Sequence, residues 1–145
     1  MITYNTVKQI YGRNYGSMQL FKRDYCNQLL YTEGVMDFQK TLNAFWVVDN
    51  VISYIPSILK TFNETDDTFY MVEICVKQDK TGYMELYHEG YIGNDYHDHL
   101  SIIEQNIPFI DLPTKVDEDI TIYKFYLMLS DYEPVKFTLL LPSEY

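Results

Sequence analysis

Cysteine, glycine and arginine are scarce in this sequence, and several catalytic motifs are missing. Cys26 and Cys75 are the only two cysteines in 145 residues, too few for the disulfide framework of a small secreted domain. Only six glycines are present, and they form neither a phosphate-binding loop nor a dinucleotide-binding fingerprint. A Gly-x-Ser-x-Gly nucleophile elbow is also missing. The sequence therefore assigns no catalytic residue, and we expect a protein that is not an enzyme.

A long apolar run is missing as well. The most apolar stretch, residues 44–59, contains Asp49 and Pro56 and is shorter than the roughly 20 apolar residues that span a bilayer. The first residues lack the basic start and apolar centre of a secretory signal. We therefore expect a cytoplasmic protein with both thiols reduced.

Negative charge is abundant, and it is unevenly distributed. The formal net charge is -10, yet residues 1–60 carry six basic and four acidic side chains, a net of +2. Residues 61–145 carry five lysines, no arginine and seventeen acidic side chains, a net of -12. An acidic surface repels nucleic acid and membranes and attracts basic protein surfaces. We therefore expect a basic protein as partner, with no direct binding of nucleic acid or membrane.

The first part of the chain has the apolar spacing of helices. Apolar residues recur at intervals of three and four after Thr32, which is a suitable N-cap; they are Val35, Phe38 and Leu42. This pattern predicts a helix over about 33–42.

A second, largely apolar helix is predicted directly after the first. Asn43 suits the left-handed conformation at a helix end, so the next helix is expected over about 44–55. Pro56 removes a backbone donor and disfavours helix at its predecessor, so we expect regular helix to end there. Residues 3–10 form a further possible helix at the start of the chain.

In the second part of the chain the apolar period becomes two, which indicates strands. Two β-hairpins are predicted, one from residues 70–76 and 83–88 around a turn at 78–82, the other from residues 121–129 and 135–141. Residues 107–113 are expected to be extended, because each of their prolines restricts the preceding residue.

Length and element order predict the fold class. A chain of this size commonly forms one domain, so we expect a single domain over residues 1–145, with a helical part at about 1–60 and a sheet part at about 67–141. Helices followed by antiparallel strands predict an α+β fold. In that fold the N-terminal helices pack on one face of a mostly antiparallel sheet of about four to five strands.

Acidic and aromatic side chains of the second half are the candidates for a partner-binding surface. The chain contains 15 tyrosines, and tyrosine is common at recognition surfaces as well as in half-buried strands. Tyr91 and Tyr96 lie in the least regular acidic segment and are the aromatic candidates. The full candidate set is Glu64, Asp66, Asp67, Glu89, Tyr91, Asp95, Tyr96, Asp98, Asp117, Glu118 and Asp119. The alternative is that these carboxylates are solvated loop charges.

The three histidines are the weak candidates for metal ligation. On a strand, His97 and His99 would point to the same side, and with His88 or an aspartate they would offer three ligands to zinc or manganese. The alternative is a polar loop between strands. The acidic runs do not match a calcium-binding loop, so no cofactor is expected.

Several segments resemble a group of known sequences. They are residues Leu29–Val35 with Ala44–Asp49, Ile107–Pro113 and Leu139–Tyr145. Together they resemble an uncharacterised family of small bacterial proteins that is frequent on phages and other mobile elements. The resemblance runs from about residue 29 to the last residue and implies no catalytic residue. It does imply a mobile-element setting in a host bacterial cell, where small acidic proteins commonly bind and disable a host defence protein.

Three hypotheses of function follow. The first is a non-enzymatic inhibitor of the anti-CRISPR type, whose acidic face docks on an RNA-guided nuclease or its ribonucleoprotein, because such nucleases hold nucleic acid in positively charged channels. The second is a metal-binding protein or metal-dependent hydrolase that uses the three histidines. The third is a small cytoplasmic structural or oligomeric protein in which acidity confers solubility.

Overall fold

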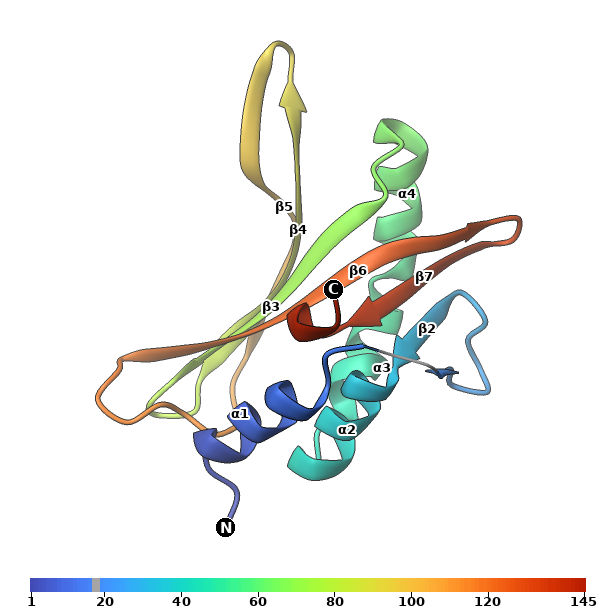
Figure 1. Cartoon of the computed structure of the whole chain (residues 1–145). Helices are drawn as coiled ribbons and strands as arrows, with labels where there is room; N and C mark the ends of the chain where they lie inside the picture. Colours follow the sequence, from blue (N-terminus) through green and yellow to red (C-terminus); the bar gives the residue numbers. More distant parts are fainter. Residues whose placement is uncertain (17–18) are drawn as a thin grey trace.

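The computed structural model describes residues 1–16 and 19–145, which form helices first and long strands afterwards (Figure 1). The elements are α1 (Tyr4–Arg13), β1 (Leu20–Phe21), β2 (Leu29–Thr32), α2 (Glu33–Leu42), α3 (Trp46–Ser53), α4 (Ile55–Thr65), β3 (Phe69–Lys77), β4 (Gly82–Ile92), β5 (Asp95–Ile107), β6 (Ile120–Tyr132), β7 (Val135–Leu140) and the short 3-10 helix η1 (Pro142–Glu144). No helix within these residues combines the length and the apolarity that a membrane crossing requires.

Helix α2 begins and ends where its sequence predicts. Thr32 Oγ1 accepts a hydrogen bond from the backbone N–H of Val35 at 3.3 Å, so it caps the helix. Asn43 takes the left-handed conformation, with φ 52° and ψ 47°, and ends the helix. Because these signals are local in the sequence, they could be read without the tertiary structure.

The prediction of one helix over about 44–55 is wrong. The structure has α3 up to Ser53 and a separate helix, α4, that begins at Ile55 and continues to Thr65. Pro56 lies in the first turn of α4. Backbone N–H groups in a first turn have no acceptor within the helix, so a proline there costs no helical hydrogen bond. The proline therefore starts a new helix, and helical structure continues to Thr65, beyond the helical part that we expected at about 1–60.

The structure is α+β as predicted, but the expected arrangement, N-terminal helices on a mostly antiparallel sheet of about four to five strands, is also wrong. The described residues form one seven-stranded mixed sheet in the order β1-β2-β7-β6-β3-β4-β5. Strands β1 and β2 precede α2, and β2 pairs parallel with β7. Both predicted hairpins form, but β3 also pairs with β6 along its whole length, and β5 adds a strand that was not predicted.

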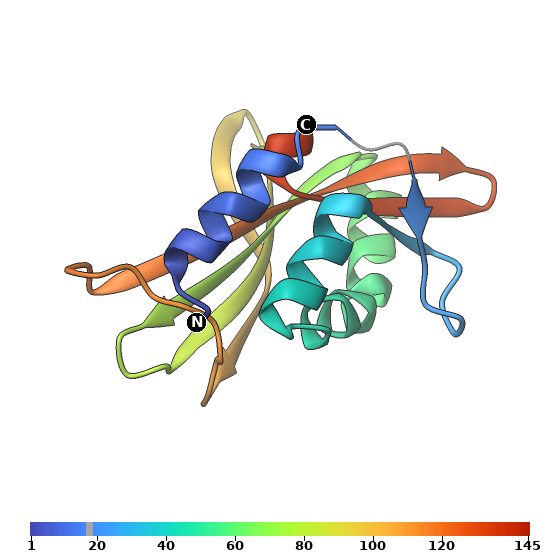
Figure 2. The ribbon, with the colours of Figure 1, turned by 60° about the horizontal axis from the view of Figure 1, so that its bottom comes forward.

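The hydrophobic core lies between helical side chains and one face of the sheet. Phe38 of α2 packs edge-to-face against Tyr123 and Phe125 of β6, with ring centroids 5.7 and 5.1 Å apart. Phe62 of α4 packs in the same way against Phe137 of β7 at 6.0 Å. Figure 2 shows α1 and α2 side by side across the sheet. Burying each of these aromatic side chains contributes about 1.5–3 kcal/mol.

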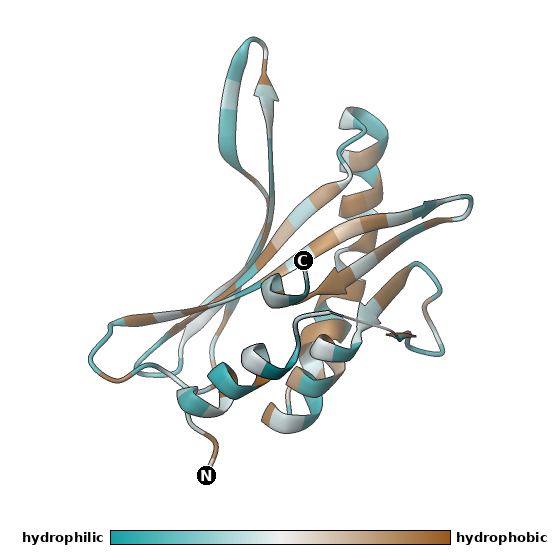
Figure 3. Ribbon diagram, in the orientation of Figure 1, coloured by the Kyte–Doolittle hydropathy of each residue, from teal (hydrophilic) through white to brown (hydrophobic). Residues whose placement is uncertain are grey.

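Strands β4 and β5 extend beyond the rest of the sheet as a two-stranded arm. Strand β3 pairs with β4 only as far as Met71 opposite Tyr87. Beyond that point β4 pairs only with β5, from His88 opposite Leu100 to Ile92 opposite Asp95. We call residues 88–100 the arm. It stands clear of the neighbouring strands in Figure 1 and is mostly hydrophilic in Figure 3.

Candidate functional site

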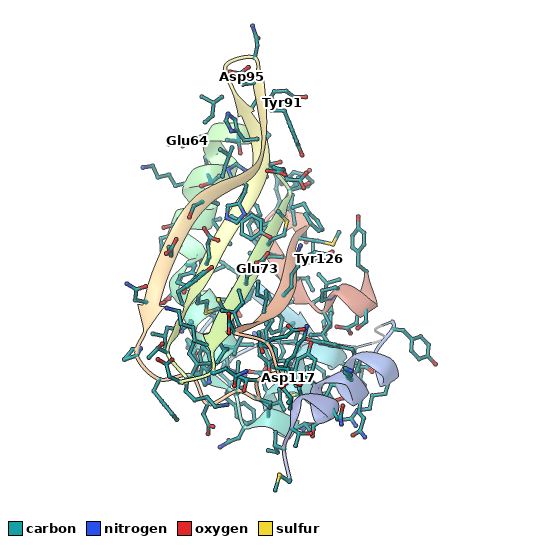
Figure 4. All side chains as sticks on the ribbon, turned by 90° about the vertical axis from the view of Figure 1, so that its left-hand side faces the viewer. Glu64, Glu73, Tyr91, Asp95, Asp117 and Tyr126 are labelled. Atoms are coloured by element: carbon teal, nitrogen blue, oxygen red, sulfur yellow. The ribbon has the colours of Figure 1, made fainter. Side chains whose placement is uncertain are left out.

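The structure places the candidate acidic and aromatic side chains in two groups at opposite ends of the sheet. Figure 4 shows Tyr91 and Asp95 near one end, and Asp117 towards the other. The first group joins the end of α4 to the arm and contains Glu64, Asp66, Asp67, Glu89, Tyr91, Asp95, Tyr96 and Asp98. The second group, Asp117, Glu118 and Asp119, belongs to the loop between β5 and β6. The two groups therefore form separate surfaces.

The tip of the arm exposes apolar side chains among its carboxylates. Tyr91, Ile92 and Tyr96 are 70, 59 and 53% exposed. Tyr91 and Tyr96 lie opposite each other in the ribbon with their rings edge-to-face at 5.4 Å. Tyr96 donates its hydroxyl proton to Glu89 Oε2 at 2.6 Å, and this hydrogen bond raises the pKa of Tyr96 to about 12. Apolar groups gathered at an exposed position are typical of partner-binding surfaces.

The base of the arm is fastened to the end of α4. Asp67 Oδ2 lies 2.5 Å from Nδ1 of His88, whose side chain is only 8% exposed. The hydroxyl of Tyr70 donates to the backbone carbonyl of Asp67 at 2.8 Å. Asp67 is therefore held by the chain itself, whereas Glu64 and Asp66 beside it are exposed.

The three histidines do not come together. His88 lies on the same sheet face as the buried Leu86, whereas His99 is stacked on Tyr87 of the other face at 3.9 Å. His97 is exposed in the arm, opposite Gly90. Within residues 1–16 and 19–145, no three His, Cys, Asp or Glu side chains lie close enough together to hold a metal ion.

The sheet face opposite the helices carries a polar network that sequence reasoning missed. We call this the open face. Tyr87 donates its hydroxyl proton to Glu73, and burial together with that bond raises the pKa of Tyr87 above its usual value. Lys124 Nζ lies 4.0 Å from the same carboxylate, at Glu73 Oε2. Glu85, which is 7% exposed, has its Oε1 2.8 Å from Nε2 of His99. The network therefore joins β3, β4, β5 and β6.

The open face is hollowed beside this network. A depression of about 330 Å³ is lined by Phe69, Met71, Tyr87, Glu89, Asp98, His99, Lys124 and Tyr126. Figure 4 shows Glu73 and Tyr126 in the middle of the sheet, below the arm. The depression therefore combines aromatic rings with carboxylates, and three of its residues, Glu89, Asp98 and His99, also belong to the arm.

The acidic loop between β5 and β6 is more nearly neutralised than the arm. Lys115 Nζ lies 3.7 Å from Glu118 Oε2. Gln78 donates through Nε2 to the backbone carbonyls of Lys115 and Glu118, at 2.7 and 2.5 Å, so the loop is held in place. A wide depression of about 700 Å³ beside it also contains Lys8 and Lys80. This end of the molecule is a mixed surface with both signs of charge.

Two of the segments that carry the family resemblance meet in the structure and have a structural role. Glu144 Oε1 accepts from Thr32 Oγ1 at 2.6 Å, and Glu144 Oε2 accepts from the backbone N–H of Gly34 at 3.1 Å. A Cβ atom at Gly34 would lie 2.4 Å from Glu144 Oε1 and 2.8 Å from Leu141 Cδ1, so any larger residue there would displace these two side chains. A carboxylate at the start of a helix is stabilised by the unpaired N–H groups there. These residues therefore connect α2 to the C-terminus.

Comparison with known proteins identifies a family but no activity. A family model described as a family of unknown function, DUF6876, matches residues 5–145. The resemblance to an uncharacterised family is confirmed to that extent. No curated protein and no solved structure matches this chain. The arm and the open face therefore have to be interpreted from their own chemistry.

Proposed function

We propose a function from the chain's own surface, because the chain belongs to DUF6876, a family of unknown function, and membership supplies no activity. The protein binds a basic protein surface through the arm and the adjoining end of α4, and it does so without catalysing a reaction. The observation that carries the proposal is the arm, a ribbon outside the core whose tip exposes Tyr91, Ile92 and Tyr96.

The arm has the features of a binding element and contributes little to the core. An isolated two-stranded ribbon is at best marginally stable in water, so a projecting ribbon with exposed aromatic rings is not explained by folding stability. Residues 81–114 contain six acidic side chains and no lysine or arginine. Such a one-signed segment attracts a basic surface and orients it during encounter.

The specific partner that we propose is an RNA-guided nuclease or its ribonucleoprotein, in the cytoplasm of a bacterial cell that carries the gene on a phage or other mobile element. The protein then acts as an inhibitor of the anti-CRISPR type. These nucleases hold guide and target in positively charged channels. The strand half that forms the arm, residues 88–92 of β4, spans roughly 15 Å at about 3.3 Å per residue. A narrow acidic ribbon of that length suits such a channel in both shape and charge.

Recovery of the partner tests the proposal. Tagged protein is incubated with a lysate of bacteria that express an RNA-guided nuclease, and the bound proteins are identified by mass spectrometry. In parallel, the purified protein is added to a target-cleavage reaction with that nuclease. We expect the nuclease to be recovered and its cleavage to be slowed. Recovery of no nuclease, together with unchanged cleavage, would show that this partner is wrong.

A matched pair of variants tests the role of the arm. The arm variant carries Tyr91→Ser, Ile92→Thr and Tyr96→Ser; the control carries Ile120→Thr and Ile122→Thr, which remove exposed apolar side chains of β6 that are 44 and 43% exposed. Since exposed aromatic anchors dominate protein interfaces, we expect the arm variant to bind at least about tenfold more weakly and the control to bind as wild type. Equal binding by both variants would place the interface elsewhere.

A further inference from the structure

The depression on the open face has the composition of a binding site for an organic cation. The rings of Phe69, Tyr87 and Tyr126 line it, and the carboxylates of Glu89 and Asp98 are at its rim. Faces of aromatic rings attract cations, and carboxylates add charge-assisted hydrogen bonds to them. Rings and carboxylates together are therefore complementary to an ammonium or guanidinium group.

The chain itself already places one cation at this position. Lys124 Nζ lies 5.7 Å from the ring centroid of Tyr126 and 4.0 Å from Glu73 Oε2. This single lysine adjoins a larger negative charge, because Glu73, Glu89 and Asp98 all border the same region. Among the described residues, no ion pair neutralises Glu89 or Asp98. The depression therefore has unmatched negative charge left for a second cation.

The rings of the depression are fixed by their neighbours. His99 stacks on Tyr87 at 3.9 Å, and the hydroxyl of Tyr87 is bound to Glu73. On the other side, the ring of Tyr145 packs edge-to-face against both Phe69 and Tyr126, at 5.6 and 5.4 Å. A site whose side chains are already ordered loses less conformational entropy when it binds.

We infer that this depression binds the side chain of an arginine that a basic partner protein presents when it docks on the arm. The inference rests on the proposed function and names the residue type that the partner supplies. Glu89 and Asp98 belong both to the depression and to the arm, so a partner seated on the arm brings its side chains to this rim. Arginine is favoured over lysine because its planar guanidinium stacks on aromatic rings and pairs with carboxylates through two hydrogen bonds.

Titration with short peptides tests this inference directly. Acetylated and amidated hexa-arginine and hexalysine peptides are titrated at about 50 mM salt into isotope-labelled protein, and NMR shifts are followed for each residue. We expect the hexa-arginine peptide to shift the Met71 methyl group and the rings of His99 and Tyr126. We also expect it to bind about three times more tightly than hexalysine.

Matched variants separate a specific site from general attraction between opposite charges. Asp98→Asn is compared with Asp119→Asn, which makes the same charge change at the other end of the sheet. Tyr126→Leu is compared with Tyr132→Leu, which removes a tyrosine that is 64% exposed. We expect Asp98→Asn and Tyr126→Leu each to weaken binding of the hexa-arginine peptide by about five- to tenfold. The controls should weaken its binding by less than about twofold. Tyr126→Phe keeps the ring and is expected to retain binding. If Tyr126→Leu fails to fold, the comparison of Asp98→Asn with Asp119→Asn still tests the site, because Asp98 is exposed and its replacement does not disturb the core.

The outcomes distinguish this inference from the proposed function. Equal weakening by Asp98→Asn and Asp119→Asn, or shifts spread over both acidic groups, overturns the site. Recovery of the nuclease from lysate by Asp98→Asn and Tyr126→Leu as efficiently as by wild type also overturns the site, but the proposed function stands. Site-specific peptide binding without any nuclease recovered supports the site and shows that the proposed nuclease partner is wrong.

Discussion

The junction between α2 and the C-terminus and the arm both contain carboxylates and aromatic rings, but they use them differently. At the junction Glu144 accepts hydrogen bonds from Thr32 and Gly34, and Phe38 of the same helix is fully buried. In the arm Asp98 is exposed, and Tyr91 is 70% exposed. At the junction, the polar and aromatic side chains find their partners within the chain. In the arm, exposed surface and negative charge remain available to another molecule.

The largest expected difference in the free energy of unfolding is between replacing a buried aromatic side chain and replacing an exposed one. Phe38→Ala removes a ring that contacts Tyr123 and Phe125, so we expect the free energy of unfolding to fall by about 3–5 kcal/mol. Tyr91→Ala in the arm is expected to change it by less than about 0.5 kcal/mol. Urea unfolding followed by circular dichroism measures both. A loss of several kcal/mol for Tyr91→Ala would mean that the arm belongs to the folding core.

A smaller contrast is expected between two carboxylates. Glu144→Ala leaves the hydroxyl of Thr32 and the N–H of Gly34 without their acceptor, and we expect the free energy of unfolding to fall by about 1–3 kcal/mol. Asp98→Ala removes an exposed side chain of the arm, and we expect a change within about 0.5 kcal/mol. The same urea titration compares the two variants. Equal losses of unfolding free energy would contradict the distinction between a junction that stabilises the fold and an arm that is available for binding.

The pH dependence of stability tests the ion pair that joins α1 to α2. Arg13 donates to both oxygens of Asp37 at 2.6 and 2.7 Å, and these bonds hold the pKa of Asp37 below its ordinary value of 3.8. Because the folded-state pKa is lowered, the stabilisation is present above the unfolded pKa of about 3.9 and is lost as pH falls through the lower folded-state pKa.

Replacing Asp37 should remove that pH-dependent part. Asp37→Asn is expected to lower the free energy of unfolding at neutral pH by about 0.5–1 kcal/mol, and the difference from wild type should shrink as the pH falls below about 4. Urea unfolding at several pH values measures it. In an Arg13→Gln background most of the difference should disappear, and a difference that persists there would assign the shift to other partners of Asp37.

Parts of the fold with local signals could be predicted from the sequence, and parts that depend on distant pairing could not. Helix α2 was found because Thr32, its apolar stripe and Asn43 all lie within one short segment. Strand β2 was missed because it has only four residues and is stabilised by parallel pairing with β7, near the other end of the sequence. Apolar alternation cannot reveal a strand that short.

Strand β5 is long, with 13 residues, but it was missed because it lacks the usual strand pattern. Its arm half is exposed on both faces, so it lacks the alternation of apolar and polar residues that marks a half-buried strand. The dipeptide Gly93-Asn94 between two β segments is a hairpin signal, and Gly93 does adopt a positive φ of 63°. That signal could have revealed the arm from the sequence alone.

The candidate site was only partly predictable. Tyr91 and Tyr96 were identified from composition, and both are exposed at the tip of the arm. The open face was not identified, because Glu73, Tyr87 and Tyr126 come from three strands. Their proximity depends on registers such as Met71 opposite both Tyr87 and Tyr126. Register between strands of different hairpins is a tertiary property that one sequence does not reveal.

The smallest expected effect concerns the hydrogen bond at the tip of the arm. Tyr96 donates to Glu89 Oε2, which stabilises the protonated phenol and raises the pKa of Tyr96 to about 12. In Glu89→Gln the carboxylate charge is gone, so the pKa of Tyr96 should fall towards the ordinary tyrosine value of about 10. NMR titration of the ring carbon that bears the hydroxyl measures this, and Asp98→Asn provides a control that removes a nearby charge without the hydrogen bond. An equal fall in both variants would indicate that general negative charge, and not the specific bond within the arm, controls this tyrosine. The carboxylates of the arm would then attract a partner through long-range electrostatics rather than through specific hydrogen bonds.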